Sequence, residues 1–132
     1  MDHTVLIVDE DVNAQIIAET LLRLRGLRVR LAGDGIEACD LVGQEDFAVV
    51  VLDLSLPGMN GFELLRRLRA RFGSIRLAAE PRVLAITSRQ EPEVEQFARR
   101  LGADAFLRKP LVPGHFVRTV EKLVAKAAPK AA

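Results

Sequence analysis

Three short runs of the chain are almost wholly apolar, at residues 5–8, 47–52 and 83–86. They are rich in β-branched residues and too short for ordinary helices, which is typical of strands buried on both faces of a parallel sheet. Two further runs, at residues 27–31 and 105–108, mix apolar and basic side chains. We expect these two to form the edges of the sheet, where one flank stays in water.

Helical periodicity fills the intervals between and after these runs. Apolar side chains recur there at spacings of three and four residues, in five segments. The positions are Ile17, Leu21 and Leu24; residues 36–42; Phe62, Leu64, Leu65 and Leu68; Val94, Phe97, Ala98 and Leu101; and Phe116, Val120, Leu123 and Val124. Gly26 and Gly102 follow the first and fourth segments as helix stops, and Asp34-Gly35 predicts a turn and a helix cap before the second.

The alternation of strand and helix, five times over, predicts an α/β fold. It gives a parallel sheet with helices on both faces, joined by right-handed crossovers. Three central apolar strands with two mixed edge strands fit the order 2-1-3-4-5 of a doubly wound, flavodoxin-like (βα)5 three-layer sandwich. Residues 71–81 fit either an extension of the third helix or a long loop, and the pattern does not decide between them.

Composition indicates one intracellular domain. The 132 residues are 49% hydrophobic, and 19 Lys and Arg against 18 Asp and Glu leave a net charge of +1, without the basic excess of a bare nucleic-acid binder. The single cysteine, Cys39, excludes an internal disulfide and is expected to be a structural thiol. Neither a membrane span nor a secretory signal is present, so we expect a soluble cytoplasmic domain over residues 1–126 and a flexible tail over 127–132.

Acidic residues follow two of the central strands. Asp9, Glu10 and Asp11 come after the first strand of the chain, and Asp53 comes after the third. In an open parallel sheet, ligands bind beyond the carboxyl ends of the strands where the strand order reverses, which here lies between these two strands. Clustered carboxylates repel one another and favour a bound cation. Oxygen ligands without nearby His or Cys favour a hard ion such as Mg²⁺.

The other two strands that reach this edge end in groups of different chemistry. Thr87-Ser88 follows residues 83–86, and Lys109-Pro110 follows residues 105–108. The expected cleft therefore holds several carboxylates, a hydroxyl and one ammonium group.

These features together resemble the receiver domain of bacterial two-component response regulators, from residue 5 to about residue 123. Five of them coincide in the order that this family has, whereas one alone would be a weak signal. They are the acids after the first strand, Asp53 with Pro57 and Gly61 in Asp-Leu-Ser-Leu-Pro-Gly-Met-Asn-Gly, Thr87, Phe106, and Lys109-Pro110.

The resemblance implies that Asp53 is the phosphoacceptor, whose carboxylate attacks phosphorus and forms an aspartyl phosphate. It implies that Asp9 and Glu10 hold Mg²⁺ together with Asp53 and the backbone carbonyl of Ser55. Many relatives have a second Asp where this chain has Glu10, and the longer side chain changes the reach to the metal. The acidic pair could also be Glu10 and Asp11, but Asp11 precedes a predicted helix and is well placed as its N-cap.

The resemblance also implies roles at the other strand ends. Lys109 would pair with a phosphoryl oxygen, Thr87 would donate a hydrogen bond to it, and Phe106 would be the aromatic switch residue. The Lys109–Pro110 peptide bond is expected to be cis. Ser55 and Arg89, two residues after Asp53 and Thr87, would flank the attacking water and influence the lifetime of the phosphoryl group.

The implied phosphodonor is a sensor histidine kinase or a histidine phosphotransfer protein. The implied output is a signalling switch rather than a dedicated enzyme, which binds a downstream protein or a second copy without contacting nucleic acid or a membrane. Its partner face would be formed by the fourth helix, the fifth strand and the fifth helix. Basic side chains near that face are otherwise expected to be ordinary solvated positions: Arg99, Arg100, Arg118 and Lys122.

Two other classes of protein fit parts of the pattern. A phosphohydrolase that forms an aspartyl phosphate commonly carries a second Asp two residues after the nucleophile, where this chain has Ser55. A flavin or nucleotide binder of the same topology needs a Gly- or Ser/Thr-rich phosphate loop after the first strand. The acids at residues 9–11 would repel a phosphate held there without metal, so we prefer the receiver interpretation.

Overall fold

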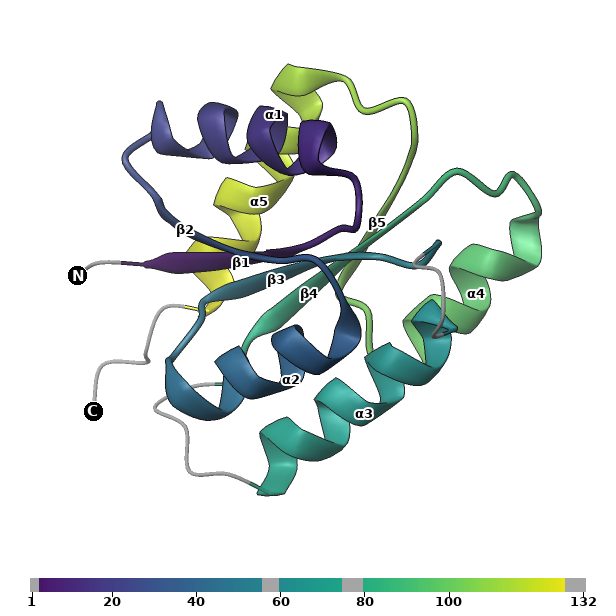
Figure 1. The fold of residues 1–132 in the computed structure, drawn as a ribbon. Coiled ribbons are helices and arrows are strands. Elements are labelled where there is room, and N and C mark those ends of the chain that lie inside the picture. Colours follow the sequence, from purple (N-terminus) through teal and green to yellow (C-terminus); the bar gives the residue numbers. More distant parts are fainter. Residues whose placement is uncertain (1–2, 56–59, 75–79, 128–132) are drawn as a thin grey trace.

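The computed structural model describes residues 3–55, 60–74 and 80–127, in which five strands and five helices alternate (Figure 1). The strands are β1 (Thr4–Val8), β2 (Arg28–Ala32), β3 (Val49–Asp53), β4 (Arg82–Thr87) and β5 (Ala105–Arg108). The helices are α1 (Val12–Arg23), α2 (Gly35–Gln44), α3 (Gly61–Ser74), α4 (Pro92–Arg100) and α5 (Pro113–Ala127). No helix within the described ranges is long and apolar enough to cross a membrane.

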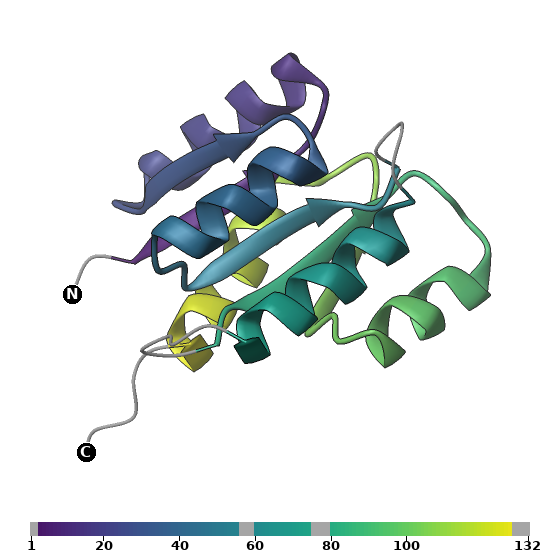
Figure 2. The ribbon, with the colours of Figure 1, turned by 60° about the horizontal axis from the view of Figure 1, so that its bottom comes forward.

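The strands form one parallel sheet in the order β2-β1-β3-β4-β5, as the alternation predicts. Helices α1 and α5 cover one face, and α2, α3 and α4 cover the other (Figures 1 and 2). Every connection between neighbouring parallel strands passes through a helix, because the chain must return to the starting edge before the next strand begins.

Two apolar cores lie on either side of the sheet because successive strand residues point to opposite faces. In β1, Val5 and Ile7 pack under α1 and α5, whereas Leu6 and Val8 pack under the other three helices. The central strands carry apolar residues at nearly every position for this reason, and β3 is buried throughout. Burying each such side chain contributes about 1.5–3 kcal/mol of hydrophobic free energy.

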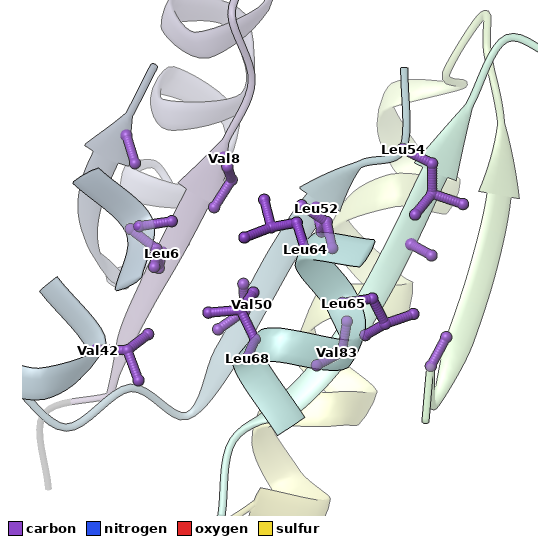
Figure 3. Close-up of a cluster of buried hydrophobic side chains, with 14 of the residues drawn as sticks. Leu6, Val8, Val42, Val50, Leu52, Leu54, Leu64, Leu65, Leu68 and Val83 are labelled. Carbon is purple, nitrogen blue, oxygen red and sulfur yellow. The ribbon is translucent and has the colours of Figure 1, made fainter. Parts of the chain in front are cut away.

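Helix α3 supplies much of the larger core. Figure 3 shows Leu64 and Leu68 pointing toward Leu52 and Val50 of β3, and all four side chains are fully buried. For residues 71–81, the sequence pattern did not decide between helix and loop. The structure continues α3 to Ser74, so this segment begins as helix. Its next five residues, 75–79, lie outside the described ranges.

Helix α1 buries a different face from its most regular apolar stripe. Ala18 and Leu22 pack against the sheet, whereas Ile17 and Leu24 are 60% and 78% exposed. A helix turns about 100° per residue, so burying Ala18 rotates its neighbour Ile17 toward solvent. Ala18 and Leu22 share one buried cluster with Phe116 of α5 and with residues of the sheet.

Helix ends follow their predicted capping residues. The Asp11 side chain accepts hydrogen bonds from the backbone N–H groups of Asn13 and Ala14 and so caps α1. Asp34 caps α2 through the N–H of Glu37. Gly26 and Gly102 follow α1 and α4 with φ of 81° and 112°, a conformation that favours glycine.

Strand boundaries differ by one or two residues from the apolar runs. β2 begins at Arg28 rather than Leu27, and β3 begins at Val49 rather than Phe47. Phe47 is buried but precedes the strand, so its apolar character reflects the core and not strand pairing. β5 occupies the four residues that the pattern predicts, all partly exposed at the sheet edge.

Candidate functional site

Asp9 and Asp53 lie side by side where β1 and β3 end. The two strands are hydrogen-bonded neighbours, so residues directly after or at their carboxyl ends share one edge of the sheet. The two aspartates are 9% and 7% exposed, which is unusual for carboxylates. The ammonium group of Lys109, which follows β5, lies 2.9 Å from Asp53 Oδ2 and 3.4 Å from Asp9 Oδ2.

The local backbone fixes the orientation of each carboxylate. The N–H of Asp11 donates to Asp9 Oδ1 at 2.9 Å, and the N–H of Ser55 donates to Asp53 Oδ1 at 2.8 Å. Each aspartate thus bonds the backbone two residues further on with one oxygen and faces Lys109 with the other. Asx turns of this kind fix the orientation of a carboxylate through the backbone of its own strand end.

Burial and charge act in opposite directions on these groups. Burial raises the pKa of Asp9 above its ordinary value, with the Asp53 charge adding to the rise, while the Asp11 N–H and Lys109 oppose it. For Lys109, burial alone would lower the pKa, but the hydrogen bond and charge of Asp53, with help from Asp9, outweigh it and raise the pKa. Lys109 is therefore a firmly held cation at neutral pH.

The donor set fits a magnesium ion. Within the described residues, no three Asp, Glu, His or Cys side chains gather into a metal-binding group, and Glu10 is exposed beside the paired Asp9 and Asp53. Mg²⁺ commonly binds through one or two carboxylates and keeps several waters, so a magnesium site built around Asp9 and Asp53 would not require a third carboxylate. Asp11 is engaged as the cap of α1, which favours Asp9–Glu10 over Glu10–Asp11 as the acidic pair.

Thr87 lies next to Ser55, at the end of the neighbouring strand. It ends β4, is fully buried, and its Oγ1 lies 3.4 Å from the hydroxyl of Ser55. The same Oγ1 accepts a hydrogen bond of 3.1 Å from the backbone N–H of Arg89. The Arg89 side chain itself is exposed and lies 3.5 Å from Glu91.

Phe106 stands apart from the acids, on the neighbouring strand. It pairs with Ala85 across the β4–β5 ladder and packs, partly buried, against the core beneath α3 and α4. The Lys109–Pro110 peptide bond is cis, which confirms the prediction. Pro57 lies outside the described residues, and Gly61 is the first residue of α3.

Two residues near the site were not singled out from the sequence. Gln15 Nε2 donates to the backbone carbonyls of Asp9 and Ala32, joining the ends of β1 and β2. Arg108 binds the loop that follows Thr87. No sequence signal marks Gln15, whereas the two-residue spacing of Arg108 from Phe106 places both on one face of β5.

Comparison with known proteins decides the family. A family model described as the response regulator receiver domain matches residues 5–121. The chain belongs to this family. Receiver domains are signalling domains rather than dedicated enzymes, which favours the signalling interpretation over the phosphohydrolase and the flavin or nucleotide binder.

The curated relatives differ widely in length, so this chain spans different shares of them. Sporulation initiation phosphotransferase F of Bacillus subtilis is 31% identical over 110 residues, 83% of this chain and 84% of that protein. The transcriptional regulatory protein GltR of Pseudomonas aeruginosa is 30% identical over 95% of this chain and 50% of its own length. The sensory/regulatory protein RpfC of Xanthomonas campestris is 30% identical over 89% of this chain, which spans 16% of RpfC.

Solved receiver structures share the fold over almost the whole chain. A CheY-like receiver domain protein of Methanospirillum hungatei JF-1 superposes with a TM-score of 0.85, at 24% identity, covering 99% of this chain and 100% of that one. Chemotaxis response regulator CheY4 of Vibrio cholerae gives 0.81 at 26% identity, covering 93% and 99%. Receivers of this kind generally bind Mg²⁺ at the phosphorylation site and interact with histidine kinases or phosphotransfer proteins.

Proposed function

We propose that this receiver accepts a phosphoryl group on Asp53 from a sensor histidine kinase or a histidine phosphotransfer protein, with Mg²⁺, and so switches partner binding. One observation carries the proposal above all. A buried carboxylate, Asp53, lies 2.9 Å from the Lys109 ammonium and beside a second acid, Asp9. Buried clusters of charged side chains like this one are typical of functional sites.

The transfer uses one oxygen of Asp53 as nucleophile. An O–P bond forms while the P–N bond to the donor imidazole breaks, and the imidazole nitrogen keeps the bonding electron pair. Ser55 N–H holds Asp53 Oδ1, which leaves Oδ2 on the side of Lys109. Lys109 then offsets the negative charge that the phosphoryl oxygens bring, since positioning and charge stabilisation dominate phosphoryl transfer.

The metal would be held by Asp9, Glu10, Asp53 and the backbone carbonyl of Ser55. Mg²⁺ would supply the positive charge that lets two acids and a phosphoryl group share one pocket. It would share the two carboxylates with the Lys109 ammonium, which lies 2.9 Å from Asp53 and 3.4 Å from Asp9.

Two side chains would set the rate at which the phosphoryl group is hydrolysed. Ser55 is exposed at the mouth of the site, two residues after Asp53. Arg89, two residues after Thr87, is also exposed. Both would flank the path of the water that attacks phosphorus.

Output would pass through Thr87 and Phe106 to the face formed by α4, β5 and α5. Thr87 is buried beside the hydroxyl of Ser55, and Phe106 lies on the next strand under α4. We propose a downstream protein or a second copy as the partner on this face. Three exposed basic side chains lie on its helices: Arg99, Arg100 and Arg118.

The test is phosphorylation of the purified chain by acetyl phosphate or a phosphohistidine protein with Mg²⁺. Wild type should gain an acid-labile phosphate, and Asp53→Asn should lose it, because an amide is not a competent nucleophile. Asp34→Asn is the matched control, since Asp34 caps α2 and asparagine caps helices equally well. Full labelling of Asp53→Asn would refute the assignment.

A further inference from the structure

The side chain of Arg108 joins three parts of the molecule. Its Nε donates to the carbonyl of Arg89 at 3.2 Å, and its Nη2 donates to the carbonyl of Glu91 at 3.1 Å. Its guanidinium carbon lies 4.9 Å from the centre of the Phe106 ring. We call these three contacts, to two loop carbonyls and one ring, the Arg108 clasp.

The clasp lies between the phosphorylation site and the partner face. Arg108 is paired with Thr87 across the β4–β5 ladder and is followed directly by Lys109. Residues 88–91 connect Thr87 to α4, and Glu91 is the N-cap of that helix, without a side-chain capping bond of its own. One guanidinium therefore holds the loop, the start of α4 and the aromatic ring together.

We propose that Arg108 is a positioning residue that stabilises the resting conformation of the β4–α4 loop and of Phe106, and so opposes activation at Asp53. This inference rests on the function proposed above and concerns the regulation of that site. Arg108 touches none of the reacting groups and acts through Thr87 and the loop.

The link to Thr87 is made by a single residue. The N–H of Arg89 donates to Thr87 Oγ1 at 3.1 Å, while the carbonyl of the same residue accepts from Arg108. If the Thr87 side chain moves its Oγ1 toward a phosphoryl group on Asp53, the Arg89 N–H must follow that oxygen or lose its hydrogen bond. Such a movement would weaken the hydrogen bonds from Arg108 to the two loop carbonyls, since hydrogen bonds weaken steeply with distance and angle.

The chemistry of the clasp requires arginine. Its planar fork donates to two carbonyls in fixed directions while its flat face stacks on a ring, a combination that the compact ammonium of lysine does not reproduce. The ion pair with Glu95 is a weaker feature, because the N–O distance is 3.7 Å and Glu95 also pairs with Arg99 at 3.0 Å. Partly exposed ion pairs contribute little, so the carbonyl and ring contacts carry the effect.

The clasp predicts that Arg108 variants bind activating ligands more tightly. A ligand that selects a minor conformation gains apparent affinity in proportion to the population of that conformation. Both Arg108→Ala and Arg108→Lys should bind beryllofluoride with Mg²⁺ about three- to tenfold more tightly than wild type, by calorimetry or NMR titration. Arg108→Lys separates the geometry of the clasp from its charge.

The matched control is Arg23→Ala at the other edge of the sheet. Arg23 also donates to a backbone carbonyl, of Val29, and pairs with a carboxylate, of Glu19, but lies on α1. Its removal should leave beryllofluoride affinity unchanged. Equal or weaker affinity in both Arg108 variants would overturn the clasp, since a merely structural role would lower stability without tightening ligand binding.

A second measurement uses the wild-type chain. The Nε–H signal of Arg108 should be protected from solvent exchange in the free protein and lose that protection when beryllofluoride binds. Retained protection would overturn the inference, even if both variants fail to fold. If wild type does not bind beryllofluoride at all, the proposed function fails instead, so the two failures are distinguishable.

Discussion

Lys109 is the residue on which the charges of the site depend. Among residues 3–55, 60–74 and 80–127, it is the one cation within hydrogen-bonding distance of Asp9 and Asp53, so the three groups together carry a net charge of about −1 at neutral pH. Burial makes this excess costly, as the raised pKa of Asp9 indicates. A divalent cation would remove it, whereas a bare phosphate would add to it.

Magnesium should therefore stabilise the folded chain. A ligand present at a hundred times its dissociation constant adds about 2.7 kcal/mol to the free energy of unfolding. We expect MgCl2 to raise the Tm of wild type in a calorimetric scan, and Asp9→Asn to lose most of that rise. KCl at equal ionic strength is the control. Equal shifts for wild type and Asp9→Asn would place the metal elsewhere.

Cys39 should react slowly with alkylating reagents. Burial raises the pKa of its thiol above the ordinary 9.0, although Arg71 and Arg67 oppose the rise. The reactive thiolate is therefore scarcer at pH 8 than for a free cysteine, and its share grows as the pH rises past 9. Iodoacetamide should modify the native chain several-fold more slowly than the chain unfolded in urea, and equal rates would contradict this.

At the scale of elements, the two glycines of α3 differ in the space that surrounds them. A Cβ added at Gly61 would lie 2.3 Å from both the Cα and the carbonyl oxygen of Leu54, at the turn after the β3 strand. Gly73, near the other end of the helix, has no atom within 4 Å of such a Cβ. The start of α3 is thus pressed against the segment that carries Asp53.

Alanine at these two positions should change stability in opposite directions. Gly61→Ala should lower the free energy of unfolding by about 2–4 kcal/mol, because backbone must move to admit the methyl group. Gly73→Ala should raise it by about 0.5–1 kcal/mol, as expected for an open helical position. Urea denaturation measures both. A stable Gly61→Ala chain would show that the close approach is not needed.

The sequence predicted elements best where one environment dominates. The apolar strands β1, β3 and β4 are buried on both faces, so their composition alone marks them. Their position also locates the two acids, because Asp9 directly follows β1 and Asp53 ends β3. The buried face of helix α1 was harder to predict. This helix carries more apolar residues than the sheet covers, and periodicity alone does not distinguish its buried face from an exposed one. The contacts of Arg108 depend on the path of residues 88–91, which no local pattern encodes.

At the scale of the whole molecule, the order of the strands connects the site to a distant face. The acids lie at the centre of the sheet, on β1 and β3, whereas Thr87 and Phe106 lie on the next two strands toward the β5 edge. The route that we propose from Asp53 to α4 therefore crosses two strand pairs, β3–β4 and β4–β5. Helices α1 and α2, toward the opposite edge (Figure 1), lie outside that path.

Phosphorylation should move Phe106 through Thr87. It adds roughly −1.5 to −2 charges and new acceptor oxygens at Asp53, which the Thr87 hydroxyl can reach by turning from Ser55. Phe106 can then turn inward into the space vacated beside β4, where burying the ring gains about 1–3 kcal/mol at most. Because phenylalanine has no hydroxyl, this movement breaks no side-chain hydrogen bond and gives up only the contact of the ring with Arg108, so the inward state should be populated appreciably even without phosphate.

NMR of the free and beryllofluoride-bound chain tests this coupling. In wild type we expect amide shifts around Asp53 and also along α4, β5 and α5, with two populations of the Phe106 ring before ligand is added. Thr87→Ala should keep the shifts near Asp53 and lose the distant ones, whereas Thr87→Ser, which retains the hydroxyl, should keep both. Shifts confined to the site in wild type, or distant shifts that survive in Thr87→Ala, would show that the buried threonine does not carry the signal.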